Sequence, residues 1–70
     1  MTDDTTQKIA DNLKTVRLSK GLTQTDVAKK AGLNTNYYAK VERGEAAATV
    51  KTLRKLVEVL EVKSADILPF

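Results

Sequence analysis

The stretch QTDVAKKAGLNTNYYAKV, residues 24–41, decides how the rest of the chain is arranged. Its apolar side chains fall at helical spacing in two groups: Val27, Ala28 and Ala31, then Tyr38 and Val41. Between the groups stands Gly32, which can take a positive φ without a Cβ clash and so end a helix. Asn34 then offers a side-chain oxygen to the first backbone N–H groups of a second helix. The stretch therefore predicts two short helices joined by a tight turn, the helix-turn-helix pattern.

Further helices are predicted on both sides of this pair. A helix over residues 5–19 follows the candidate caps Asp3, Asp4 and Thr5. A helix over residues 50–60 has apolar side chains at spacings of three and four, namely Val50, Leu53, Leu56, Val57 and Leu60. A final turn over residues 64–68 is stopped by Pro69. No segment shows the alternation of a strand, so the predicted fold class is all-α with five short helices.

Composition excludes several classes of protein. The 70 residues include no Cys and no His, which removes disulfides, the usual zinc ligands and the usual general base. No carboxylate pair with a nucleophile and no Gly-rich phosphate loop is recognisable, so we expect no enzyme, no cofactor and no metal site. No apolar run is long enough to span a bilayer, and the acidic start MTDDTTQ is not a signal peptide. We therefore expect one cytoplasmic domain over residues 1–70, with an acidic polar tail at 1–7.

Basic residues are concentrated around the predicted helix pair. The net charge is +3, but residues 8–44 carry eight Lys and Arg side chains against three acidic ones. Residues 45–70 carry four of each sign, and the tail contributes Asp3 and Asp4. This distribution favours a face that binds a polyanion such as nucleic acid, although a solvated basic surface could also produce it.

Three motifs resemble the lambda-repressor-like family, the Cro/cI-type (Xre) helix-turn-helix proteins of phages and bacteria. They are LTQTDVAKKAGL at 22–33, YYAKVERG at 37–44 and TVKTLRKLVEVLEV at 49–62. The resemblance implies a five-helix DNA-binding domain whose recognition helix, about residues 35–42, enters the major groove. The short length and the "LEV" ending are also similar to the controller proteins of restriction–modification systems.

The resemblance implies roles for particular residues. Three of them would contact base edges: Thr35, Asn36 and Lys40. Five would contact the DNA backbone: Thr23, Gln24, Asn34, Tyr37 and Arg43. The match further implies a structural ion pair between Arg17 and Glu42. Alternatives stay open for Thr35, which could only support the helix cap, for Lys40, which could bind phosphate, and for Tyr37, whose ring could pack across the surface.

Four features depart from the family pattern. Thr35 stands where many relatives carry Arg or Gln, and it cannot grip guanine bidentately. The loop Ala46-Ala47-Ala48 lacks the usual basic and Asn side chains, and Tyr38 replaces an aliphatic core residue. Glu61 stands where relatives often have a helix-ending Gly, so it must adopt a left-handed backbone at a cost of roughly 1 kcal/mol or end the helix differently.

The apolar C-terminal residues Ile67, Leu68 and Phe70 are assigned to a dimer interface, with core packing as the alternative. We therefore expect a sequence-specific regulator of transcription, a homodimer on palindromic double-stranded DNA, bacterial or phage-encoded and associated with the nucleoid. RNA polymerase is a further candidate partner if the protein activates transcription. The rival hypotheses are an antitoxin-type module that masks a partner protein and an architectural DNA binder without sequence preference.

Overall fold

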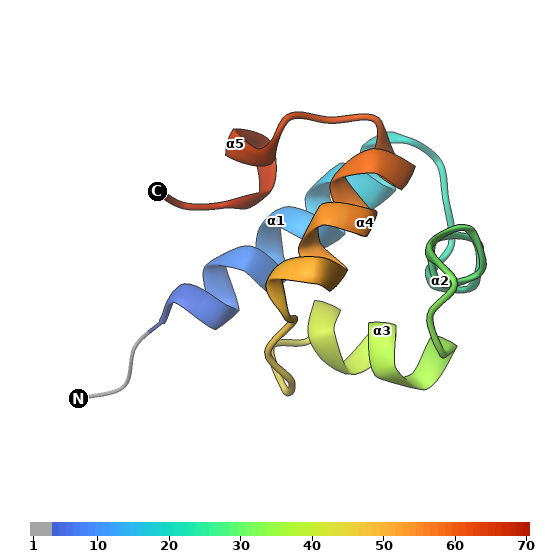
Figure 1. Cartoon of the computed structure of the whole chain (residues 1–70), viewed down its shortest axis with the longest axis horizontal. Helices are drawn as coiled ribbons and strands as arrows, with labels where there is room; N and C mark the ends of the chain where they lie inside the picture. Colours follow the sequence, from blue (N-terminus) through green and yellow to red (C-terminus); the bar gives the residue numbers. More distant parts are fainter. Residues whose placement is uncertain (1–3) are drawn as a thin grey trace.

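Residues 4–70, the part that the computed structural model describes, form five α-helices and no strand (Figure 1). The helices are α1 (Thr5–Ser19), α2 (Gln24–Ala31), α3 (Thr35–Glu42), α4 (Val50–Leu60) and α5 (Ser64–Ile67). The predicted all-α class is thus confirmed. Asp3, a candidate cap, lies outside the described residues, and the second half of the predicted acidic tail is the first turn of α1.

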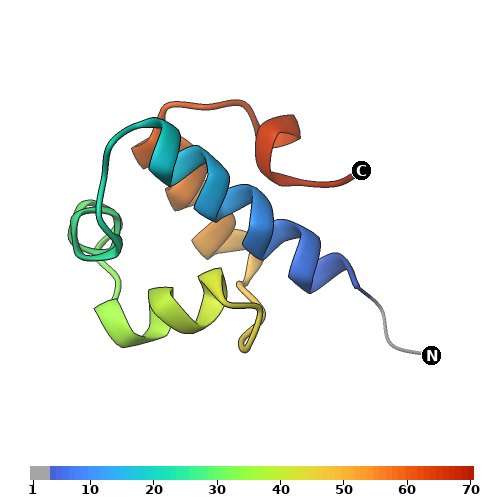
Figure 2. The same cartoon turned by 180° about the vertical axis from the view of Figure 1, so that it is seen from behind.

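The helices pack around the helix-turn-helix formed by α2 and α3. Helix α2 contacts both α3 and α4, whereas α1 contacts α3 and α5. In both views α3 runs along one edge of the molecule with no other helix beyond it (Figures 1 and 2). One long side of α3 is therefore not covered by any other helix of residues 4–70.

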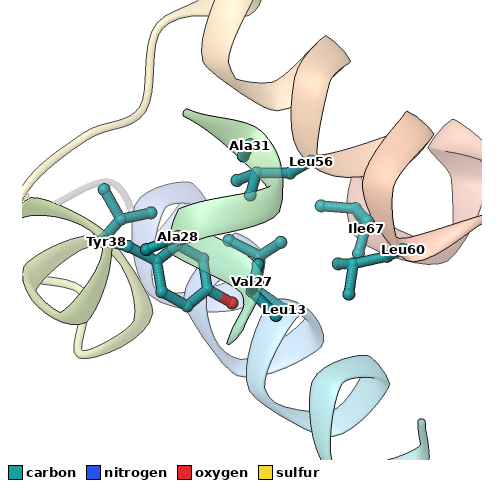
Figure 3. Packing of buried hydrophobic residues seen from close by; sticks show 9 residues of the cluster. Leu13, Val27, Ala28, Ala31, Tyr38, Leu56, Leu60 and Ile67 are labelled. Atoms are coloured by element: carbon teal, nitrogen blue, oxygen red, sulfur yellow. The ribbon is translucent and has the colours of Figure 1, made fainter. Parts of the chain in front are cut away.

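The core is shared by all five helices (Figure 3). Its buried members are Leu13, Val27, Ala28, Ala31, Tyr38, Val41, Leu56, Leu60 and Ile67. Ala28 is fully buried, and its small side chain suits the point where α2 meets its neighbours. Burial of each Leu or Ile side chain in this cluster stabilises the fold by about 1.5–3 kcal/mol.

Side chains cap the N-termini of three helices, as the sequence predicts for Asn34. The Oγ1 of Thr23 accepts from the backbone N–H of Asp26 at 3.0 Å, and the Asp26 carboxylate accepts from the N–H of Thr23 at 2.9 Å, which forms a capping box. Asn34 caps α3, and Thr49 caps α4. Asp4 occupies the N-cap position of α1, but its side chain makes no capping hydrogen bond.

Each of the first four helices ends in a Schellman motif. The defining hydrogen bonds run from the N–H of the residue that follows the left-handed residue to a carbonyl five residues earlier: Leu22 to Arg17 (3.2 Å), Leu33 to Ala28 (2.8 Å), Glu45 to Lys40 (2.9 Å) and Val62 to Val57 (3.2 Å). Glu61 takes the left-handed position of α4, with φ 56°, where the other three helices use Gly. Glu61 therefore adopts the left-handed backbone, the first of the two outcomes expected for it.

Two expectations about apolar residues are wrong. Ile67, assigned to a dimer interface, is 0% exposed, because α5 turns it into the core against Leu60 and its neighbours. Val50, whose helical spacing with Leu53 and Val57 suggests a place on the apolar side of α4 that faces the core, is instead 83% exposed. It is the first residue of α4 and faces an open hollow beside α5, so the helical spacing alone does not bury it.

Candidate nucleic-acid interface

The outer face of α3 carries a stripe of polar side chains. Asn36, Lys40 and Arg43 are all exposed and stand four and three residues apart, so they follow one side of the helix axis. The opposite side is buried through Tyr38 and Val41. The helix therefore presents one amide and two cations along the free edge of the molecule, an arrangement suited to the donor- and acceptor-rich floor and the phosphate walls of a DNA groove.

The N-terminus of α3 is fixed by Asn34. Its Oδ1 accepts from the backbone N–H of Asn36 at 2.8 Å and from that of Tyr37 at 3.2 Å. The cap oxygen is therefore committed to the helix, as its role as a cap requires. Thr35 is half-buried in the first turn, whereas Asn36 is exposed. Of the two, Asn36 has the longer reach and the more open surroundings.

The start of α2 is attached to the end of α3 by Gln24. Its Nε2 donates to the Oε1 of Glu42 at 3.3 Å, and the side chain is half-buried. Thr23, next to it, is exposed and uses its hydroxyl in the capping box. Thr23 and Gln24, both predicted to contact the DNA backbone, thus lie together at the N-terminal end of α2. Gln24 is also hydrogen-bonded to the end of α3.

A buried ion pair connects α1 to α3. The guanidinium of Arg17 donates from Nε at 3.0 and 2.9 Å and from Nη2 at 2.7 Å to the carboxylate of Glu42. Its Nη1 donates to the carbonyl of Leu22 at 2.8 Å. The side chains are only 10% and 1% exposed. The ion pair that the resemblance implies is therefore present, and it fixes the angle of α3 relative to α1.

The same contacts shift both pKa values. The hydrogen bonds with Glu42 raise the pKa of Arg17 despite its burial. Burial by itself would raise the pKa of Glu42, but the hydrogen bond from Arg17, aided by its other polar neighbours, outweighs burial and leaves that pKa lowered. Both groups are therefore charged at neutral pH.

Tyr38 brings an unusual polar group into this site. Its ring is 0% exposed, as its inward assignment predicts, and burial beside the carboxylate of Glu42 raises the pKa of the phenol. Among the described residues, its hydroxyl has no partner with hydrogen-bond geometry. The sequence predicts the buried ring but not the position of its hydroxyl next to the ion pair. The presence of Tyr at a position where relatives carry an aliphatic core residue is the signal that could have suggested it.

At the two ends of the α3 face, Tyr37 and Arg43 differ in their surroundings. Tyr37 is half-buried and packs against the edge of the core, and this contact restricts the position of its ring. Arg43 is exposed and pairs through Nε with the carboxylate of Glu45, an acidic residue to which the sequence pattern assigns no role. Arg43 is the last member of the exposed stripe of α3, and Tyr37 follows Asn36, its first member.

On the side of α4 and α5, apolar side chains surround a hollow of about 380 Å³. Val50 and Phe70, which are 83% and 86% exposed, stand at its edge with the half-buried Leu68. Ile67 lies beneath it. Exposed aromatic and branched side chains around one hollow are typical of a surface that a protein partner covers.

Helices α2 and α3 are joined by a short turn at Gly32, and α3 presents a polar side at the edge of an all-α domain. This arrangement is typical of the helix-turn-helix class. The sequence profile of the Helix-turn-helix family HTH_3 matches residues 13–67, so the chain belongs to this family. The family resemblance found in the sequence is thereby confirmed. No helix in residues 4–70 is both long and apolar enough to cross a bilayer.

Similar proteins fall in the same class. The HTH-type transcriptional regulator y4dJ of Sinorhizobium fredii, itself uncharacterised, is 33% identical over 64 residues, covering 91% of this chain and 83% of that protein. The restriction-modification controller protein C.AhdI from Aeromonas hydrophila matches with a TM-score of 0.84 and 30% identity, over 87% of this chain and 92% of that one. The controller C.Esp1396I, crystallised as a tetramer on its natural 35 base-pair operator, matches with a TM-score of 0.84 and 33% identity, over 91% and 84%.

Proposed function

We propose that this protein regulates transcription as a homodimer that places α3 of each subunit in the major groove of a palindromic operator. That it is a DNA-binding transcriptional regulator rests on its family and on relatives that include a regulator and an operator-bound controller. The observation that carries the proposal is the exposed stripe of Asn36, Lys40 and Arg43 on the free edge of the domain.

Asn36 is the principal base-contacting residue in this proposal. Its amide nitrogen can donate to N7 of adenine while its amide oxygen accepts from the N6 amino group. Such a bidentate pair is worth about 1–3 kcal/mol of discrimination against another base. Support comes from its exposure in the first turn of α3, the part of a recognition helix that meets base edges. Thr35 adds contact through its methyl group to a thymine methyl, and Lys40 lies one turn further along the same face.

The remaining polar side chains hold the domain on the phosphates. Gln24 and Thr23 stand at the N-terminus of α2, where backbone dipoles also favour anions. Arg43 ends the α3 stripe, Tyr37 lies next to Asn36 in the chain, and Asn34 lies where α3 begins. Such contacts fix the register of α3 in the groove and carry little sequence information of their own.

Dimerisation covers the hollow between α4 and α5. Val50, Leu68 and Phe70 supply the apolar surface that the second subunit contacts. Ile67 is buried beneath this surface and makes no contact with the second subunit. The domain measures 34 × 24 × 21 Å. Two copies side by side can therefore present their α3 helices about one helical turn apart, roughly 34 Å, which is the half-site spacing of a dimeric helix-turn-helix.

Regulation then follows from occupancy of the site. The dimer blocks a promoter or helps RNA polymerase bind beside it, and no step of catalysis is assigned to the protein. One subunit contacts only a few base pairs, so a monomer would be titrated by non-specific sites, whereas the two-fold dimer doubles the recognised sequence.

Selection of duplexes from a random pool, followed by binding titrations on the selected site, tests the proposal. We expect a palindrome, loss of tight binding when half a helical turn is inserted between its half-sites, and relaxed preference at one base pair for Asn36→Ala. The matched control Lys55→Ala, exposed on α4, should keep the preference. Recovery of no common sequence, or equal affinity for a single half-site and the full site, would contradict the dimeric recognition.

Salt dependence gives an independent check. The logarithm of the binding constant should fall by about 0.9 per phosphate neutralised as the logarithm of the salt concentration rises. Gln24→Ala should weaken binding to all sequences about equally. An affinity that does not respond to salt would remove the DNA-binding assignment.

A further inference from the structure

Glu45 lies where it can compete with DNA for Arg43. The two side chains form an ion pair through the Arg43 Nε and the Glu45 carboxylate, and they are 55% and 54% exposed. Arg43 is the last member of the α3 stripe and is one of the proposed phosphate contacts. A carboxylate and a phosphodiester offer the same kind of anionic oxygen to a guanidinium, so the pair resembles the contact that DNA would make.

The backbone holds Glu45 beside Arg43. The Schellman motif at the end of α3 runs from the N–H of Glu45 to the carbonyl of Lys40 at 2.9 Å and from the N–H of Gly44 to the carbonyl of Val41 at 3.1 Å. Gly44, with φ 77°, reverses the chain, and a Cβ there would overlap the amide of Gln7. The position of Glu45 is therefore fixed by main-chain hydrogen bonds that do not involve its carboxylate.

The residue type at this position has no packing explanation. In the Schellman motifs of α1, α2 and α4 the equivalent residues are Leu22, Leu33 and Val62, all apolar and packed against the core. An apolar contact at this position is the usual companion of the motif. Glu45 is instead charged and exposed, and the partner recorded for its carboxylate is Arg43.

We propose, on the basis of the function proposed above, that Glu45 is a positioning residue that limits the affinity for DNA by holding Arg43 in the free protein. To bind a phosphate, Arg43 must leave Glu45 or bring that carboxylate close to the phosphate charge. Either route weakens binding to every sequence alike, because phosphate contacts carry no base information. The ion pair thereby shortens the time that the dimer spends on non-specific DNA, and discrimination between base pairs depends on Asn36.

The expected size of the effect is modest because the pair is exposed. Exposed ion pairs change an equilibrium by about one- to fivefold. Removing the Glu45 charge also removes its repulsion of the nearest phosphate. Glu45→Gln should therefore tighten binding to a mixed-sequence duplex by about three- to tenfold at low salt. Its salt dependence should steepen by up to about 0.9 in the log–log slope, the value of one additional phosphate contact.

The test is a double-mutant cycle measured by fluorescence anisotropy on a labelled mixed-sequence duplex of about two helical turns. The variants are Glu45→Gln, Arg43→Gln and the double substitution, with Glu58→Gln on α4 as a control for net charge. We expect tighter binding for Glu45→Gln, a clearly smaller gain when Arg43 is already Gln because only the lost phosphate repulsion then remains, and a smaller gain for Glu58→Gln.

Equal gains for Glu45→Gln and Glu58→Gln would overturn the proposal, since the effect would then be one of net charge. So would a Glu45→Gln gain of the same size in the Arg43→Gln background, or no gain at all in a protein that binds DNA. Failure of the unsubstituted protein to bind any duplex would instead contradict the proposed function. Melting temperatures of the unsubstituted protein and the four variants establish that each is folded.

Discussion

Replacing Arg17 by Met should destabilise the domain far more than its single lost charge suggests. The substitution removes three hydrogen bonds to Glu42 and one to the carbonyl of Leu22. Glu42, whose side chain is 1% exposed, keeps the hydrogen bond from the amide of Gln24 at 3.3 Å and the neighbouring hydroxyl of Tyr38, neither of which carries a charge. An uncompensated buried carboxylate is thereby left in the interior.

Breaking a buried pair from one side costs about 3–5 kcal/mol. A domain of 70 residues has a total stability of roughly 3.5–10 kcal/mol, so the loss is a large share of it. At about 4–8 °C per kcal/mol for a domain of this size, the melting temperature should fall by about 12–40 °C. Removal of both charges, as in Arg17→Met with Glu42→Leu, should recover much of the loss because no buried charge remains.

Thermal and urea unfolding followed by circular dichroism measure these effects. Lys14→Met is the matched control, because Lys14 is exposed on the same helix α1. The variant should also respond differently to acid: without Arg17, burial raises the pKa of Glu42, so protonation at low pH should narrow the gap to the unsubstituted protein. Equal melting temperatures for Arg17→Met and Lys14→Met would refute the reasoning about the buried pair.

Three further predictions concern stability. The pKa values of Glu42 and Asp26 are lowered in the folded protein, the first by the hydrogen bond from Arg17 that outweighs burial and the second mainly by the backbone N–H of Thr23. Their contribution to the free energy of unfolding is therefore complete above the ordinary pKa values, 4.5 for Glu42 and 3.8 for Asp26, and is lost as the pH falls through the lowered values. Urea midpoints should therefore drop below pH 4.5, and less so for Glu42→Gln. Glu61→Gly should raise the free energy of unfolding by about 0.5–1 kcal/mol, since relief of the left-handed backbone exceeds the entropy cost of Gly, and an unchanged or lower melting temperature would contradict this. Tyr38→Phe should be neutral or stabilising by up to about 1 kcal/mol because it removes a buried hydroxyl without a hydrogen-bond partner among the described residues, and a loss above that size in calorimetry would show that the hydroxyl is bonded.

Local chemistry explains why the helices themselves could be predicted. Thr23, Asn34 and Thr49 cap the helices that follow them, and each cap depends on a side chain and the N–H groups two or three residues on. Helix ends depend equally on nearby residues, as in the turn at Gly32. The exposed stripe of α3 follows from the 3.6-residue period once its buried side is known.

The sequence by itself therefore determined the five helices, their caps and the polar side of α3, because these depend on neighbours within about one turn. Only the tertiary structure decided which apolar residues are buried, since burial depends on which distant surface arrives. Ile67 enters the core while Val50 remains open, although both belong to apolar patterns. The same holds for the hydroxyl of Tyr38 beside Glu42 and for Glu45 on Arg43, contacts set by how the chain folds back on itself.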